Sequence, residues 1–392
     1  MREKLSVLLA FILIFAFSSV DNAVSPMVGR IAQTYGVGLE KVLWLISACT
    51  AGTVLGVFLG PWFTSRLKPG GLLAVSAAAM TLSQAGFLLG DNFALGAALR
   101  FLSGFASGVI AACMWRLTFH GVSKRYYPAM VAVLLSARPL ATAIGVPMAG
   151  LAGAQFYWQA PLWAMAAAVL LAGTALSLAY PEEAAPPVKT AGLFSAYASV
   201  LKAPYAKAYY AGFTVNRMCY FGFYAVAGIW FTKHYGLSLK SLSFALLIIG
   251  LAEALVNFTA ARIIRRLGQK RALDLSLSLS FISLMAFVWG GLPLKTAVAL
   301  ITVFMLLDRV YSMALVLTIP EMFPQTGDKT AFGSLNTLTA WAGLTIIAWL
   351  AGLFPGDKGL LVTEILLALS FTAGSAVLYF VQKRTVVATR SS

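Results

Sequence analysis

The chain has few of the side chains that hold metals or form disulfides. It contains three cysteines and two histidines in 392 residues. Cys49, Cys113 and Cys219 lie in apolar stretches without paired spacing, and His120 and His234 stand singly near the ends of such stretches. A disulfide framework needs paired cysteines, and a zinc site needs clustered cysteines and histidines. We therefore expect neither, and we expect no cofactor.

The chain also has no phosphate-binding loop. Direct coupling to ATP needs a glycine-rich loop that ends in lysine, because its backbone N–H groups cradle the phosphates. No such segment occurs, and no set of catalytic side chains stands out. We do not expect an enzyme.

Charge is scarce as well, at 11% of the chain, and only 13 residues are acidic. Hydrophobic residues make up 60%, and the mean hydropathy is +0.85. A chain of this composition cannot cover a water-soluble surface, so the sequence indicates an integral membrane protein. Apolar stretches of about 20 residues, the length that crosses a bilayer as a helix, follow one another almost without pause.

The apolar stretches predict an all-α membrane protein with twelve transmembrane helices. The first stretch follows Arg2 and Lys4, as in a signal peptide, but it has no convincing cleavage site, so we keep it as the first helix. The predicted spans are 5–26, 42–64, 70–90, 93–119, 129–153, 158–180, 206–231, 240–264, 272–292, 296–319, 329–353 and 359–382.

The helices divide into two six-helix bundles, residues 1–180 and 206–392, with a cytoplasmic linker at 181–205. The linker begins with PEEAAPP, which must leave the membrane, and Gly192 to Leu201 should form a short amphipathic helix on its surface. Two such bundles suit a carrier whose binding site lies between them near the midplane of the membrane.

The basic residues of the short loops indicate the orientation. If the helices alternate in direction, most loop lysines and arginines fall on the side of the two termini. Loops rich in these residues stay in the cytoplasm. We therefore expect cytoplasmic termini in a multi-pass protein of the cytoplasmic (inner) membrane, with the lipid bilayer as a partner. The net charge of +16 then reflects the orientation of the chain in the membrane, and we do not expect nucleic-acid binding. We expect the protein to be a monomer.

Several ionisable residues fall deep inside the predicted helices. A charge at bilayer depth is costly unless it faces protein or water, so the helices that carry these residues should line a central cavity. A buried carboxylate can take up or release a proton as a partner arrives or leaves. We predict that Asp308 carries the proton, with Asp21 and then Glu253 as alternatives. The full set is Asp21, Arg100, Arg138, Arg217, Glu253, Asp308 and Arg309.

In this set the arginines outnumber the carboxylates by four to three. A guanidinium holds a carboxylate through two parallel hydrogen bonds, so the surplus favours an anionic or zwitterionic small-molecule cargo. Polar and aromatic neighbours would complete an amphipathic pocket. The predicted substrate-binding residues are Arg217, Arg138, Arg309, Asn216, Tyr220, Tyr224, Tyr311 and Trp115.

Each of these residues also has a purely structural interpretation, because buried charges are often simply paired. Arg100 could pair with Asp21 or with backbone carbonyls. Adjacent residues on a helix diverge by about 100°, so Arg309 could point away from Asp308 toward a neighbour. The tyrosines at 220 and 224, four residues apart, could pack as a stripe against another helix.

Several segments carry motifs. The loop at 60–68 reads GPWFTSRLK, and its counterpart at 261–271 reads ARIIRRLGQKR. The fourth predicted helix contains RFLSG at 100–104, and the fifth contains GVPMAG at 145–150. The first predicted helix contains an acidic residue followed by asparagine, DN, at 21–22.

With these segments the chain resembles the major facilitator superfamily, and within it the bacterial proton-coupled exporters of drugs and metabolites. The resemblance covers the whole chain and implies that the first, fourth, seventh and tenth helices are innermost. It also implies a proton-coupling role for Arg100. Ser65 and Arg265 depart from the pattern, because the family usually has an aspartate there. The resemblance further implies a cytoplasmic gate made of Arg66, Arg266, Gly268, Lys270 and Arg271.

These observations predict a secondary active transporter that exports a small organic molecule in exchange for protons. An anionic or zwitterionic cargo, such as a siderophore-like metabolite or a drug, fits the arginine surplus. A proton-coupled importer of an organic anion and a transporter of lipid or lysolipid remain the alternatives.

Overall fold

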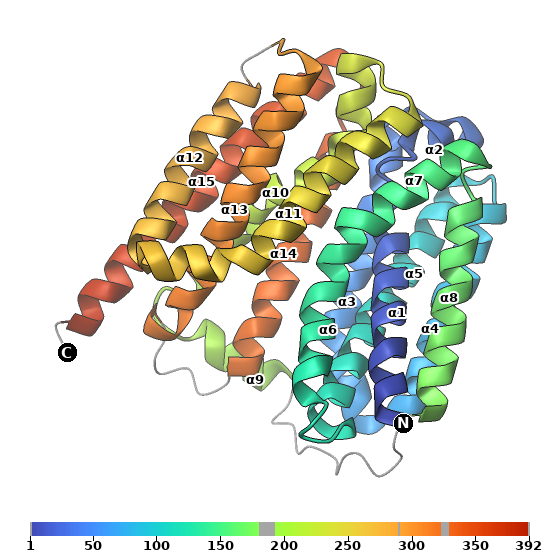
Figure 1. Cartoon of the computed structure of the whole chain (residues 1–392), viewed down its shortest axis with the longest axis horizontal. Helices are drawn as coiled ribbons and strands as arrows, with labels where there is room; N and C mark the ends of the chain where they lie inside the picture. Colours follow the sequence, from blue (N-terminus) through green and yellow to red (C-terminus); the bar gives the residue numbers. More distant parts are fainter. Residues whose placement is uncertain (1, 180–192, 289–290, 323–328, 391–392) are drawn as a thin grey trace.

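In a computed structural model of the chain, the structure describes residues 2–179, 193–288, 291–322 and 329–390, which are helical almost throughout and contain no strand (Figure 1). The first half begins with α1 (Arg2–Asn22), α2 (Val28–Tyr35) and a 3-10 turn (Glu40–Val42). It continues through α3 (Leu43–Arg66), α4 (Pro69–Leu89), α5 (Phe93–Arg116), the π-helical turn Leu117–Gly121, α6 (Tyr127–Leu140), the π-helical turn Ala141–Gly145, α7 (Val146–Gln155) and α8 (Ala160–Ala179).

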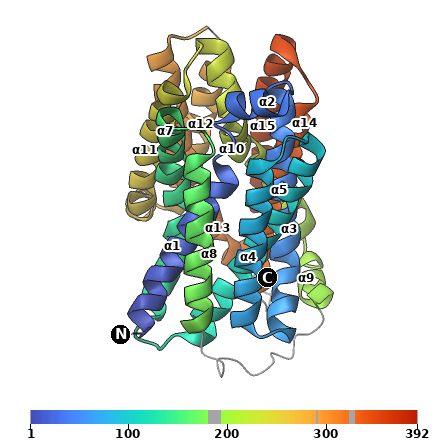
Figure 2. The ribbon, with the colours of Figure 1, turned by 90° about the vertical axis from the view of Figure 1, so that its right-hand side faces the viewer.

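The second half follows the short helix α9 (Leu193–Leu201), which confirms the helix predicted in the linker. Its elements are α10 (Ala206–Tyr235), α11 (Leu239–Leu267), α12 (Gln269–Val288), α13 (Leu294–Met322), α14 (Lys329–Gly352) and α15 (Gly356–Arg390). Figure 2 shows α9 toward the end of the molecule where both chain termini lie.

Eleven helices of the described residues are long and apolar enough to cross a membrane, six in the first half and five in the second. The remaining predicted span, 206–231, is the seventh and corresponds to the 30-residue helix α10, which is less apolar because it carries Asn216, Arg217 and several tyrosines. The structure is therefore consistent with the predicted twelve-helix fold of six helices in each half.

Two predicted helices differ from their observed forms, and prolines explain both differences. The first was expected to reach residue 26, but α1 ends at Asn22 and a turn leads into α2. Pro26 disfavours helical geometry at the residue before it. The fifth is broken by the π-helical turn between α6 and α7, which lies between Pro139 and Pro147. A proline inside a helix removes a backbone hydrogen bond and distorts the ladder.

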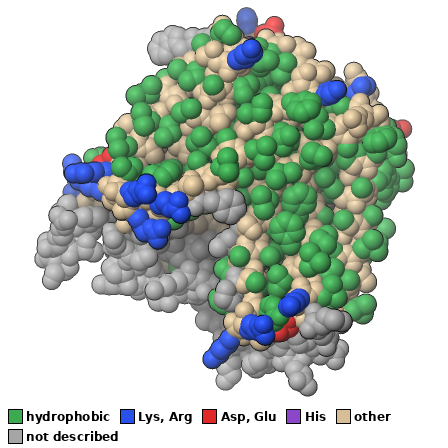
Figure 3. All heavy atoms as spheres, in the orientation of Figure 1, with side chains coloured by type: hydrophobic (Ala, Val, Ile, Leu, Met, Phe, Trp, Pro, Cys, Tyr) green, Lys and Arg blue, Asp and Glu red, His purple; other side chains and the backbone are tan. Residues whose placement is uncertain are grey.

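The outer surface is apolar, as a bilayer requires. Leu82 on α4, Leu171 on α8, Ile282 on α12 and Leu369 on α15 are each more than half exposed. Figure 3 shows hydrophobic side chains over most of one face, with lysine and arginine gathered toward its ends. These four helices correspond to the predicted spans 70–90, 158–180, 272–292 and 359–382, which carry none of the deep ionisable residues named above.

Small residues bring α3 and α5 into close contact. A Cβ built on Gly104 would lie 1.8 Å from the carbonyl oxygen of Cys49, and one built on Gly108 would lie 2.6 Å from the nitrogen of Val57. Only glycine leaves room for backbones at this separation, which is the common way for helices to associate in a membrane.

The two halves meet at the end of the molecule away from the termini. There Lys233 donates to Glu40 Oε1 at 2.6 Å, and the Gly356 N–H donates to the same oxygen at 2.9 Å. Gly228 packs so tightly that a Cβ would lie 1.8 Å from the carbonyl oxygen of Ser25. Glu40 and Ser25 belong to the first half and their partners to the second, so this end is closed.

Toward the termini, the halves diverge (Figure 1). Helix α11 packs against α7 and the π-helical turn before it, but hardly against α6, which lies nearer that end. On the opposite side α3 and α14 stay together, where the Thr345 hydroxyl donates to Thr50 Oγ1 at 2.9 Å. The two bundles therefore contact each other at the end away from the termini and separate toward the termini along the side of α11 and α6.

Candidate functional site

An ion pair between α10 and α13 lies at the centre of the second half. Arg217 donates to both carboxylate oxygens of Asp308, at 2.7 and 2.9 Å, and the two side chains are almost fully buried. Asn216 supports the pair, since its Oδ1 accepts from Arg217 Nε at 3.0 Å and its Nδ2 donates to Ser375 at 2.9 Å. Both oxygens of Asp308, the predicted proton carrier, are therefore held by an arginine.

A second ion pair joins α13 to α11. Arg309 donates to Glu253, which is 5% exposed, and the Tyr220 and Tyr224 hydroxyls donate to the same carboxylate. The side chains of Arg309 and Asp308 thus diverge around α13, as adjacent helical residues must. The two tyrosines of the predicted pocket serve here as ligands of a buried carboxylate.

In the first half, Arg100 ties α5 to the end of α1. Its guanidinium, fully buried, donates to the carbonyl oxygen of Asp21 at 2.7 Å and to those of Val20 and the Gln84 side chain at 3.3 Å. The last carbonyls of a helix have no partner within the helix, so the arginine satisfies two of them. Of the two structural partners considered for Arg100, the structure contains the backbone carbonyls.

The carboxylate of Asp21 is therefore left with weak partners. Its Oδ1 accepts from the Cys49 thiol at 3.5 Å, and its Oδ2 has no hydrogen-bond partner in the described part of the chain. Asp21 is 4% exposed. A buried charged oxygen without a partner is costly, and in native proteins such an atom calls for an explanation.

Arg138 on α6 is the arginine that extends from one half to the other. Its guanidinium lies 5.3 Å from the centre of the Phe17 ring and 4.8 Å from that of Trp341 on α14. Its Nη2 is buried and has no hydrogen-bond partner among the described residues. Phe17 and Asp21 are four residues apart on α1 and share a face, which places Arg138 about one helical turn from the Asp21 carboxylate.

Two further predicted substrate-binding residues lie apart from Arg138. Tyr311 is 1% exposed and borders the Arg217–Asp308 pair through Ser375, which also accepts from Asn216, and its ring centre lies 6.5 Å from that of Phe371 on α15. Trp115 is 41% exposed in the last turn of α5. It follows Arg100 by fifteen residues, or about 22 Å along a helix, and so lies near the end of the bundle.

The residues of the predicted cytoplasmic gate are all exposed at the loops. Arg66 lies over the ring of Trp62 at 4.5 Å. Gly268 has a φ of +80°, a backbone conformation that favours glycine, and turns the chain from α11 into α12. Within the described residues, no ion pair ties Arg66, Arg266, Lys270 or Arg271 to a carboxylate, and the gate stays a prediction.

The sequence reasoning missed Trp341, Phe221, Gln84 and Glu364. Trp341 and Phe221 stack with ring centres 6.0 Å apart and planes at 19°. Gln84 was recognisable as a polar residue inside an apolar stretch, but tryptophan and phenylalanine in such stretches give no signal. Glu364 on α15 is 8% exposed and accepts from Trp230 at 2.7 Å.

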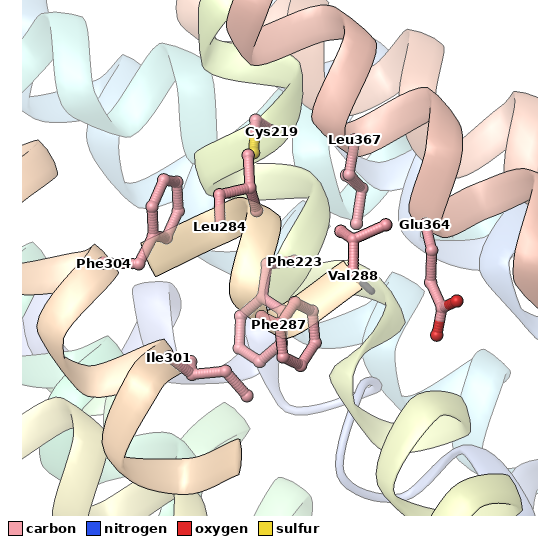
Figure 4. Close-up of a pocket in the computed structure, with 9 residues that line it drawn as sticks. All are labelled: Cys219, Phe223, Leu284, Phe287, Val288, Ile301, Phe304, Glu364 and Leu367. Carbon is pink, nitrogen blue, oxygen red and sulfur yellow. The ribbon is translucent and has the colours of Figure 1, made fainter. Parts of the chain in front are cut away.

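Glu364 lies at the edge of a small apolar pocket between α10, α12, α13 and α15 (Figure 4). In the figure the rings of Phe223, Phe287 and Phe304 surround the pocket, and the carboxylate of Glu364 lies to one side. The cavity is about 10 Å³. That is close to the least space that holds one water molecule, so this pocket is too small for a cargo.

Comparisons with known proteins place the chain among transporters. The model of the Major Facilitator Superfamily matches residues 8–355. The "Uncharacterized MFS-type transporter YceJ" of Bacillus subtilis (strain 168) is 22% identical over 302 residues, which cover 73% of this chain and 72% of YceJ.

Solved transporters share the fold. A bacterial homolog to the human lysosomal transporter Spinster, in an inward-facing and unoccupied conformation, has a TM-score of 0.79 at 10% identity and covers 98% of both chains. The human organic anion transporter MFSD10 has a TM-score of 0.64 at 17% identity, with 95% of this chain and 99% of that chain covered. At these identities the likeness concerns the fold alone.

Proposed function

The chain belongs to the Major Facilitator Superfamily and is a multi-pass membrane transporter, and we propose that it exports a small zwitterionic or anionic organic molecule in exchange for protons. The assignment as a transporter rests on the family and the fold. The cargo, the coupling and the direction are inferred from the charged side chains between the two halves.

The observation that carries the proposal is the pair of unpartnered buried atoms at Asp21 and Arg138. Arg217 neutralises Asp308, and Arg309 neutralises Glu253, so neither pair adds net charge. Arg138 Nη2 and Asp21 Oδ2 have no hydrogen-bond partner within the described residues. A zwitterion whose carboxylate binds Arg138 and whose ammonium binds Asp21 would satisfy both atoms.

This arrangement determines that protons and a zwitterionic cargo move in opposite directions. A proton and an ammonium group compete for the Asp21 carboxylate, because each neutralises it. Uptake of a proton from outside would therefore release a zwitterion outward, and loss of that proton to the cytoplasm would allow the next one to bind. Asp21 is favoured over Asp308 and Glu253 for this role, since each of the latter forms a direct ion pair with an arginine, whereas Arg100 and Arg138 act on the Asp21 carboxylate only through space.

A cargo that is only anionic would reverse the coupling. With no ammonium to bind, an ionised Asp21 would repel the anion from Arg138, and a protonated Asp21 would admit it. Proton and anion would then move together, as in the importer alternative.

The conformation fits the proposed orientation. The closed end lies away from the termini, and the basic loops indicate that the termini are cytoplasmic. The protein would then be open toward the cytoplasm, in the same sense as the inward-facing Spinster homolog.

The test uses the purified protein in liposomes that contain a pH-sensitive dye. Zwitterionic, purely anionic and purely cationic probes of similar size are added under a pH gradient. Proton movement opposite to zwitterion flux supports the proposal, and proton movement in the same direction as an anion supports the importer. A response to cations alone would overturn both, because it would leave Arg138 without a role.

A further inference from the structure

Aromatic rings and arginines form one continuous stack across the boundary between the halves. It runs from Phe17 through Arg138 to Trp341, and then to Phe221 at 6.0 Å between ring centres. Phe221 meets Tyr220 edge-on at 4.9 Å, and Arg309 lies over the Tyr220 ring at 4.7 Å. The stack thus connects Arg138, whose Nη2 has no hydrogen-bond partner in the described part of the chain, to the Arg309–Glu253 pair of the second half.

The stack is accessible at its middle and at Arg309, whose side chain is 25% exposed. Phe17 and Tyr220, near its ends, are each 1% exposed, whereas Arg138, Trp341 and Phe221 are partly exposed. A molecule that reaches Arg138 therefore meets the rings of Trp341 and Phe221 on the same approach.

Close backbone contact fixes the position of Trp341. A Cβ built on Gly343, two residues further along α14, would lie 2.6 Å from the carbonyl oxygen of Thr214 on α10. Helices α14 and α10 are held together there, so the ring of Trp341 is kept against Phe221, which lies two turns further along α10.

We propose that Trp341 and Phe221 select cargo that carries an aromatic ring next to its carboxylate. This inference rests on the proposed function, because it assumes that the carboxylate binds Arg138. Trp341 contacts the guanidinium through its ring face, and Asp21 acts on Arg138 through space, but among the described residues neither gives Arg138 Nη2 a hydrogen bond. A cargo carboxylate adds the missing ion pair, and its ring can stack on Trp341 or Phe221 in the same pose.

Two probes can distinguish ring stacking from burial of apolar area as the source of affinity. L-Phenylalanine and β-cyclohexyl-L-alanine carry the same charges and differ in that only the first has a flat π face. If burial of apolar area decided affinity, the cyclohexyl compound would bind at least as well. If the stack decides it, the aromatic compound binds about tenfold more tightly.

The experiment measures the binding of these two probes to the full-length protein in nanodiscs, by equilibrium dialysis. Wild type is expected to prefer phenylalanine about tenfold, Trp341→Phe to keep most of that preference, and Trp341→Leu to lose it while binding the cyclohexyl compound as before. Trp349→Leu is the matched control. Trp349 lies on the same helix and is half exposed, so its loss should leave both affinities unchanged.

The outcomes distinguish this inference from the proposed function. Equal binding of the two probes, lost in Arg138→Met, would overturn aromatic selection and leave the zwitterion site intact. Retained preference in Trp341→Leu and in Phe221→Leu would also overturn it. Binding of neither probe to wild type would count against the proposed function and this inference together.

Discussion

Asp308 and Arg309 are neighbours in the chain, yet each forms an ion pair with a different helix. Asp308 binds Arg217 on α10, and Arg309 binds Glu253 on α11. One pair of adjacent residues on α13 thus ties three helices of the second half together. This explains why a charged dipeptide is stable in the middle of an apolar helix, where a lone charge would be costly.

Breaking the first of these pairs should destabilise the protein. Asp308→Asn leaves Arg217 buried without a carboxylate, which costs about 3–5 kcal/mol in comparable cases. The double variant Asp308→Leu/Arg217→Met should recover most of the loss. Thermal unfolding in detergent measures the effect, with Asp274→Asn on partly exposed α12 as control. An Asp308→Asn protein as stable as wild type would show that the pair is unimportant for folding.

Arg138 is expected to respond in the opposite way. Its Nη2 has no hydrogen-bond partner in the described part of the protein, so Arg138→Met should leave the unfolding temperature unchanged or slightly raised. Cargo binding should nevertheless fall by at least tenfold, because the carboxylate loses its ion pair. Arg309→Met is the matched control and should lower stability. Destabilisation by Arg138→Met would identify a structural contact in place of a binding role.

The contact of Glu40 with Lys233 and Gly356 should hold the far end of the molecule closed. In a variant whose native cysteines are replaced by serine, Ser25→Cys reports on that end, since Ser25 is 6% exposed. Adding Glu40→Gln should raise its rate of maleimide labelling several-fold, because the charge-assisted bond to Lys233 is lost.

The control for this change is Glu3→Gln at the other end, where Glu3 accepts from the Ser123 N–H at 2.7 Å. It should leave the labelling of Cys at position 25 unchanged. An equal increase with both variants would mean that labelling follows general loosening and not opening of the closed end.

Glycine packing between α3 and α5 gives a fourth prediction. Gly104→Ala places a methyl group 1.8 Å from the Cys49 carbonyl, so the helices must separate, at a cost of about 1–3 kcal/mol. Gly71→Ala on α4 is the control, because nothing lies within 4 Å of its added carbon. Unfolding temperatures of the two variants make the comparison, and equal values would show that the contact relaxes freely.

The sequence predicts the helices of this protein well, because length and apolar composition determine which segments cross a bilayer. It predicts less well which polar residues meet. Tyr220 and Tyr311 look alike as tyrosines beside buried charges, but Tyr220 binds the Glu253 carboxylate directly, whereas Tyr311 meets the Arg217–Asp308 pair only through Ser375. The choice depends on which face of each helix meets a neighbour, and this is set by tertiary packing.

Trp341 is a residue of the candidate site that the sequence does not reveal. A tryptophan in an apolar helix costs nothing in lipid or in a protein interior, so its position in the chain does not indicate its role. Its contact with Arg138 requires α14 of one half to meet α6 of the other. Only the arrangement of the two bundles brings these residues together, whereas the deep charges were recognisable at once because hydrocarbon does not tolerate them unpaired.

The central claim is that Asp21 exchanges its proton for the positive group of the cargo. Proteoliposomes that hold wild type, Asp21→Asn or Arg138→Met test it when zwitterion flux and internal pH are recorded together. We expect both variants to lose zwitterion flux together with the proton movement that accompanies it, because neutral Asn mimics the protonated Asp21 that releases the cargo and Met removes the ion pair to the cargo carboxylate. Proton-coupled flux that persists in Asp21→Asn would contradict the account.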